Sequence, residues 1–286
     1  MRAWKLLVAA AAISLTGCVW TPGKFTSELA LHRGGTFVLD YRGEIIFQMP
    51  NDKDKPAAPW NRSMAQCYVG REPELRAGGE LTAPRPEGAD SPTTRACTAA
   101  EIAGLKAQYQ KEAAEQAEKK RKDADQMAKM FGLTGADDES NRRFAANLMK
   151  YKGWRSVAYR GKGVFDVNYH FEGRADQDFA FPMIPDTDLI VPFIAIRRRN
   201  DGAVLVTAPA FTGGTGPFGA RAMAAGLPKS DDGPQSRAEG RFTVTTDAEI
   251  LTNNSEDGPV AAPSGKQLHW DVGAASKKIP ETLVRL

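Results

Sequence analysis

The chain has 286 residues, with 38 Lys and Arg, 35 Asp and Glu, and a formal net charge of +3 at pH 7. This near balance argues against a protein that follows nucleic-acid phosphates, because such a protein needs a basic stripe. The length suffices for one large or two modest domains with a hydrophobic core.

Residues 1–18 have the composition of an export signal. Arg2 and Lys5 precede an uncharged apolar run over residues 6–15. A transmembrane helix needs roughly 20 apolar residues, whereas a secretory signal has a basic start and an apolar run of about 7 to 15. We therefore expect residues 1–18 to direct export, and we exclude them from the fold.

The end of this segment, Leu15-Thr16-Gly17-Cys18, resembles the lipobox of bacterial lipoproteins. The resemblance implies that Cys18 becomes the first residue of the mature protein and carries lipid. Several acyl chains on one residue would hold the protein stably on a membrane. In such lipoproteins an aspartate directly after the lipid-bearing cysteine resembles a signal for retention in the inner membrane. Val19 occupies that position here, so the same resemblance favours the outer membrane. The alternative is an ordinary secretory signal with an incidental cysteine.

The two remaining cysteines, Cys67 and Cys97, form an even pair in a compartment that permits disulfides. A bridge would close a loop rich in Pro, Gly and charge, and would stabilise the fold by about 3 to 4 kcal/mol. Two unrelated thiols are the alternative. The absence of a Cys-x-x-Cys motif argues against a redox role.

Residues 23–49 are predicted to form a β-hairpin. Phe37, Leu39 and Tyr41 occupy alternate positions after the turn at residues 33–35, so one face should be buried. From residue 51 to residue 96, Pro, Gly and charged residues dominate, which is typical of an irregular excursion.

A long helix should follow, because Thr98 and Glu101 match a capping box. Its middle is mainly Ala, Glu, Gln and Lys, which favour helix but offer little to bury, and Gly132 should end it. We expect residues 51–135 to form an insertion made of a disulfide-tied loop and this helix. A helix that binds a partner or forms a coiled coil is the alternative.

A second, shorter helix is predicted after residue 137, with Phe144, Leu148 and Tyr151 on one face that packs on a sheet. The strand over residues 164–172 follows, and its large side chains on one face indicate a central, covered strand. These side chains are Phe165, Val167, Tyr169 and Phe171. His170 should point to the opposite, open face.

Residues 186–286 are predicted to form a β-rich C-terminal section, preceded by a strand at residues 178–181. Within the section we expect strands at residues 189–198, 203–208, 242–246, 249–252, 267–272 and 282–286. The element order predicts an α+β protein, a mainly antiparallel sheet covered by helices, with residues 19–286 as its body. Two domains that divide near Asp186 are the alternative.

No residue pattern predicts a catalytic, cofactor or metal site. His32, His170 and His269 are far apart in sequence, and zinc sites need closely spaced ligands. No Gly-x-Ser-x-Gly occurs, and the glycine-rich residues 213–216 lack the Gly-Lys-Ser/Thr ending of a phosphate loop. Residues 197–199 are three arginines that could meet anionic headgroups, although such a run is more often a charged strand end.

The order of lipobox, early hairpin, helix and late strand with His269-Trp270 resembles envelope lipoproteins of the LppM-like type. That resemblance implies a role in lipid handling or envelope binding and transfers no functional residue. We expect a lipid-anchored, non-enzymatic binding or assembly module whose partner is an envelope protein or an apolar envelope molecule. The alternatives are an envelope hydrolase that uses His170 or His269 with nearby acids, and a purely structural lipoprotein.

Overall fold

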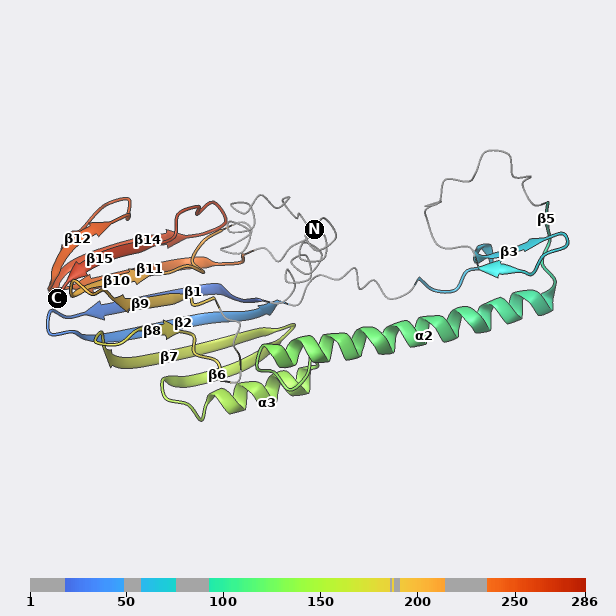
Figure 1. The fold of residues 1–286 in the computed structure, drawn as a ribbon, viewed down its shortest axis with the longest axis horizontal. Coiled ribbons are helices and arrows are strands. Elements are labelled where there is room, and N and C mark those ends of the chain that lie inside the picture. The colour runs from blue at the N-terminus through green and yellow to red at the C-terminus, as the bar shows by residue number, and fades with distance from the viewer. Residues whose placement is uncertain (1–18, 49–57, 76–92, 186, 188–190, 214–235) are drawn as a thin grey trace, which may run out of the picture. The chain divides into compact units, whose positions relative to one another are not determined.

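The computed structural model divides the chain into two compact units. Unit 1 comprises Met1–Asp52 and Ala124–Leu286, and unit 2 comprises Lys53–Asp123. The structure describes residues 19–48, 58–75, 93–185, 187, 191–213 and 236–286. Within these residues the fold is mixed, with two α-helices and sheets whose strands are mainly antiparallel, as the α+β prediction requires (Figure 1).

The larger sheet of unit 1 has seven strands in the order β13-β14-β11-β1-β2-β7-β6. Its neighbours are antiparallel except β1 and β11, which run parallel. The long strands β1 and β2 are joined by the tight turn at residues 32–35 and lie near the middle of the sheet. The strand bounds are β1 Val19–Leu31, β2 Thr36–Gln48, β6 Trp154–Gly161, β7 Val164–Arg174, β11 Glu239–Thr246, β13 Val260–Ala262 and β14 Gly265–Val272.

A second, five-stranded antiparallel sheet has the order β12-β15-β10-β9-β8. Aromatic rings join it to the inner face of the larger sheet: Phe37 lies 5.0 Å from Phe179, and Tyr41 lies 4.9 Å from Phe181, between ring centroids. The two sheets therefore pack face to face. The strand bounds are β8 Phe179–Phe181, β9 Ile194–Arg198, β10 Ala203–Thr207, β12 Glu249–Asn253 and β15 Glu281–Arg285.

The expectation that helices cover the sheet is wrong, because the second sheet does so. Its strands carry their own fully buried apolar rows, including Ile194, Ile196 and Val204. Helix α3 (Asp138–Leu148) packs beside the edge strand β6, where Phe144 meets Trp20 and Phe165. Most of α2 (Ala99–Met130) has too few apolar side chains to cover a sheet.

The predicted core row on β7 is confirmed: Phe165, Val167 and Tyr169 are buried, and Phe171 is half-buried against Phe179. The prediction for α3 is partly wrong, because the helix ends at Leu148 and Tyr151 lies beyond it with 45% of its surface exposed. The helix begins as expected, since Asp137 accepts a hydrogen bond from the Ser140 amide at 2.8 Å.

The described residues of unit 2 form three short strands, a 3-10 turn and the first part of α2. Strand β3 (Ala65–Tyr68) pairs with β4 (Glu74–Leu75) and β5 (Thr94–Arg95), and the turn η1 spans Arg62–Met64. The helix begins with the predicted capping box: the Glu101 amide donates to Thr98 Oγ1, and the Thr98 amide donates to Glu101 Oε2 at 2.8 Å.

The C-terminal end of α2 belongs to unit 1, where Ala128 and Phe131 are buried. Gly132, at φ +84°, ends the helix as predicted. Its amide donates to the Lys129 carbonyl, and the Leu133 amide donates to the Ala128 carbonyl at 3.1 Å.

Candidate functional site

The outer face of the seven-stranded sheet carries polar side chains in register across five neighbouring strands. Cα pairing aligns a central row that runs from β14 through β11, β1 and β2 to β7. This row consists of His269, Thr243, Glu28, Asp40 and His170. Because side chains of directly paired residues stand about 5 Å apart, neighbours in the row can contact one another. We call this face, with its two flanking rows, the polar face.

One flanking row is polar throughout, and the other is polar except for Ala30 and Val38. One row pairs Asp271, Arg241, Thr26, Arg42 and Asn168, and the other pairs Gln267, Thr245, Ala30, Val38 and Glu172. Arg241 Nε donates to Asp271 Oδ1 at 2.7 Å, and this arginine lowers the pKa of Asp271. Thr26, Glu28 and Arg42 are exposed. The polar face therefore offers donors and acceptors of both charges to solvent.

His170 lies on this face, opposite the buried row of β7 as predicted, and sits between two carboxylates. Its Nδ1 is 2.9 Å from Asp40 Oδ1, and its Nε2 is 3.2 Å from Glu172 Oε1. A neutral imidazole has one N–H donor, so only the doubly protonated ring can donate to both carboxylates at once. The carboxylates hold the ring in place and leave neither nitrogen directed at a nucleophile.

The other two histidines also contact carboxylates. His269 Nε2 lies 3.0 Å from Asp257 Oδ2, and His32 Nδ1 lies 3.9 Å from Asp247 Oδ1. The Asp247 carboxylate accepts from the Arg33 amide, which lowers its pKa. Within the described residues, no histidine is hydrogen-bonded to a serine or cysteine side chain. A serine or cysteine nucleophile activated by a histidine would need such a pair.

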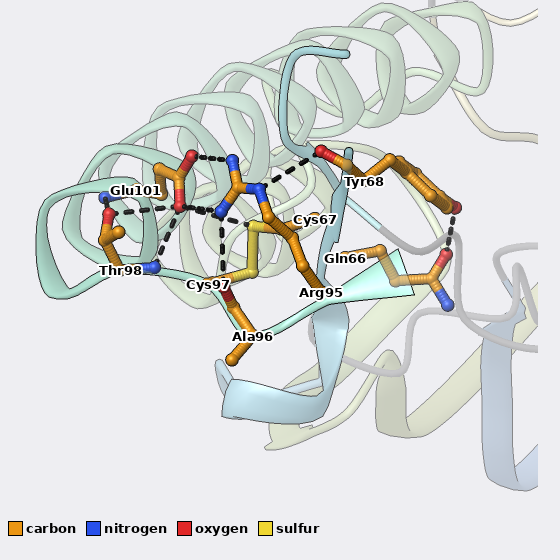
Figure 2. Close-up of a disulfide and its surroundings, with 8 residues drawn as sticks. All are labelled: Gln66, Cys67, Tyr68, Arg95, Ala96, Cys97, Thr98 and Glu101. Carbon is orange, nitrogen blue, oxygen red and sulfur yellow. Dashed lines mark hydrogen bonds and ion pairs between the residues drawn. A yellow bond between two sulfur atoms is a disulfide. The ribbon is translucent and has the colours of Figure 1, made fainter. Parts of the chain in front are cut away.

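The residues singled out in the sequence occupy different parts of the molecule. Cys18 lies outside the described residues, whereas the Sγ atoms of Cys67 and Cys97 are 2.05 Å apart, at disulfide distance. Figure 2 shows this pair beside Arg95 and Glu101 at the start of α2. Of the arginines at residues 197–199, all exposed, Arg199 pairs with Asp201 at 2.9 Å.

Glu101 joins the disulfide region to the helix. Its carboxylate accepts from the guanidinium of Arg95 at 2.5 and 2.9 Å and from the Thr98 amide. The hydrogen bond from Arg95, followed by that from the Thr98 amide, lowers the pKa of Glu101 to about 2. This cluster is explained by its position: it fastens β5 to the first turn of α2, and it needs no ligand.

The described part of the chain shows neither a metal-ligand cluster nor a membrane-spanning helix. It contains no group of three or more His, Cys, Asp or Glu side chains arranged to hold a metal ion. None of its helices has both the length and the apolar character needed to span a bilayer. Residues 214–216 of the glycine-rich run lie outside the described ranges.

Sequence reasoning missed most of the polar face. Glu28, Asp40 and Arg42 occupy the positions between the buried residues of β1 and β2, so alternation could have identified them as outward-facing. Their alignment with Thr243 and His269 depends on the parallel pairing of β1 with β11. No local pattern predicts a pairing between strands that are about 200 residues apart.

Comparisons of this chain with protein-family models, with curated proteins and with solved structures find no match.

Proposed function

We propose that this protein is a bacterial envelope lipoprotein that binds a partner and performs no chemistry. Residues 1–18 direct export, a lipid on Cys18 holds the protein at the membrane, with the outer membrane favoured, and the body serves as a binding or assembly module. The resemblance of residues 15–18 to a lipobox is the starting point.

One observation carries the anchoring proposal: the chain is paired in the β1–β2 ladder from Val19 onward, directly after the lipobox cysteine. Cleavage before Cys18 would therefore leave every described strand and helix whole. The proximity of Cys67 and Cys97 is also in keeping with an oxidising compartment outside the cytoplasm.

Metabolic labelling with a palmitate analogue tests the anchor. The wild-type protein should take up the label, and Cys18→Ala should not. The matched control is the double variant Cys67→Ala/Cys97→Ala, which removes the other two cysteines and should keep the label. Label that persists in Cys18→Ala, or wild-type protein without label, would sink the anchoring proposal.

For the binding role we favour the polar face. The inner side of the seven-stranded sheet is not open to an apolar ligand, because aromatic residues of the second sheet and Phe211 already pack against it. The outer side instead presents exposed groups such as Glu28 and Arg42. These groups suit a polar partner, because exposed charges can exchange water for hydrogen bonds and ion pairs across an interface.

In-cell photo-crosslinking tests this role. A photoreactive residue in place of Thr26, on the polar face, should give a discrete adduct, and one in place of the exposed Arg197 on β9 should not. Adding Asp40→Lys should reduce the Thr26 adduct, since it reverses a charge two positions from Arg42 on the same face of β2. Equal adducts at both positions, or none at Thr26, would contradict a partner on the polar face.

The structure also changes how the alternative site, the long helix, must be tested. Deleting residues 101–132 would remove Leu105, Ala128 and Phe131, all of which are buried. Loss of partner capture in such a deletion could therefore reflect misfolding. Substitutions in the exposed stretch of α2 from residue 114 to residue 123 avoid that problem.

A further inference from the structure

The N-terminal end of β1 is fixed in the core of unit 1. Val19 pairs with Gln48 and Trp20 pairs with Phe47 in the β1–β2 ladder. The Trp20 side chain is 2% exposed, its Nε1 donates to the Phe131 carbonyl at 3.3 Å, and its rings contact those of Phe47 and Phe144. The chain therefore has no free linker between position 18 and the folded body.

The absence of a linker limits how far the body can lie from a lipid on Cys18. An extended residue spans at most about 3.6 Å, so the Cα of Trp20 lies within about 7 Å of the Cα of Cys18. A flexible linker of ten Gly and Ser residues would instead allow a separation of about 17 to 19 Å. A lipid on Cys18 would thus bring the end of unit 1 that contains Trp20 to the headgroup layer.

Two other segments surround this end of unit 1. The β6–β7 turn, residues 160–163, is held there because the Phe47 amide donates to the Gly163 carbonyl at 2.8 Å. The end of α2, residues 129–132, is held by the bond from Trp20 to Phe131. We call the end formed by Trp20, Phe47 and these two segments the anchor end.

The anchor end presents exposed lysines that suit an anionic headgroup layer. Of three nearby carboxylates, Asp166 forms an ion pair with Arg160 at 2.7 Å, whereas Glu44 and Asp138 accept hydrogen bonds from uncharged donors, the Lys24 amide at 3.0 Å and the Tyr159 hydroxyl at 2.6 Å. Lys129 and Lys162 are exposed, and neither forms an ion pair with a carboxylate of the described residues. Each such lysine near an anionic surface favours binding.

We infer that the anchor end of unit 1 lies directly on the phospholipid headgroups, with Lys162 and Lys129 facing lipid phosphates. The opposite end, at the turn of residues 32–35, then points away from the membrane. Strand β1 has 13 residues, which places its two ends about 40 Å apart. This inference rests on the proposed lipid at Cys18 and adds an orientation to it.

Fluorescence quenching by lipids with nitroxide-labelled headgroups tests the orientation. The full mature protein, isolated from membranes, is placed in vesicles of phosphatidylethanolamine and phosphatidylglycerol. A fluorophore is attached through an unnatural amino acid at Lys162 or, as the matched control, at Gly34, where a side chain would meet no atom within 4 Å. The probe at position 162 should lose most of its fluorescence, and the probe at position 34 should keep it.

A linker variant provides the second arm. Inserting ten Gly and Ser residues between Cys18 and Val19 should leave membrane attachment intact but reduce the quenching at position 162 toward that at position 34. Equal quenching at the two positions without the linker, in protein that stays on the vesicles, would overturn the orientation and leave the anchor standing. Protein that does not associate with the vesicles at all would overturn the anchor itself.

Discussion

Unit 1 and unit 2 are stabilised by different means. Unit 1 has an aromatic core between two sheets, in which Phe25, Tyr41 and Phe181 each contact several other rings or residues. Among the described residues of unit 2, by contrast, only Cys67 and Leu105 are buried. Unit 2 depends on the Cys67–Cys97 pair, on the capping box and on the ion pair of Arg95 with Glu101. Burial can stabilise a large unit, whereas a small one needs a covalent crosslink.

The largest expected effect is the loss of a core ring in unit 1. Phe181 is fully buried and contacts the rings of Tyr41, Tyr169 and Phe193. Phe181→Ala should lower the free energy of unfolding by about 3 to 5 kcal/mol, because it removes contacts and leaves a cavity. Denaturant unfolding followed by circular dichroism measures this loss. The control Val69→Ala replaces an exposed residue of unit 2 and should change the free energy of unfolding little. Similar losses for both variants would refute the contrast between a core-stabilised unit 1 and a crosslinked unit 2.

Removing the crosslink should affect unit 2 alone. In Cys67→Ala/Cys97→Ala we expect unit 2 to lose about 2 to 4 kcal/mol, because the open loop gains conformational entropy when unfolded. Hydrogen exchange should then speed up in β3 and the first turns of α2, while β7 keeps its protection. Equal loss of protection in β7 would mean that the two units do not unfold separately.

A smaller effect is expected at the start of α2. Thr98→Ala removes the hydroxyl that accepts from the Glu101 amide, and should destabilise the helix start by about 1 kcal/mol. The control Thr94→Ala changes an exposed threonine four residues earlier in the chain. Amide exchange over the first turn of α2 compares the two variants, and an equal effect of both would argue against the capping role.

The smallest effect concerns acid. The hydrogen bond from Arg95, more than any other contact, lowers the pKa of Glu101 in the folded protein from about 4.5 to about 2. A lowered carboxyl pKa stabilises the folded state above the unfolded pKa, and that stability is lost as the pH falls from about 4.5 toward 2. An acid titration of helix content should show this loss in the wild type and a weaker dependence in Glu101→Gln. Identical titrations would refute the role of the ion pair.

The same contrast shows what the sequence could predict. Local rules identified the capping box at Thr98 and Glu101, the end of α2 at Gly132 and the buried row of β7, because each depends on neighbouring residues. The cysteine count also predicted that Cys67 and Cys97 come together. The prediction that helices cover the sheet was wrong, because tertiary packing decides whether a helix or a second sheet covers it. The alignment of the polar face required the β1–β11 pairing, which no local rule contains.

We propose above all that the mature protein begins at Cys18 and carries lipid there, so that β1 follows directly on the anchor. Intact-protein mass spectrometry of material extracted from membranes tests it most directly. We predict a mass equal to residues 18–286 with two fewer hydrogens, as for a disulfide, plus a diacylglyceryl group in place of the thiol hydrogen of Cys18 and an acyl group in place of one hydrogen of its amine. A mass that equals an unmodified chain, or one that begins at any other residue, would contradict the account.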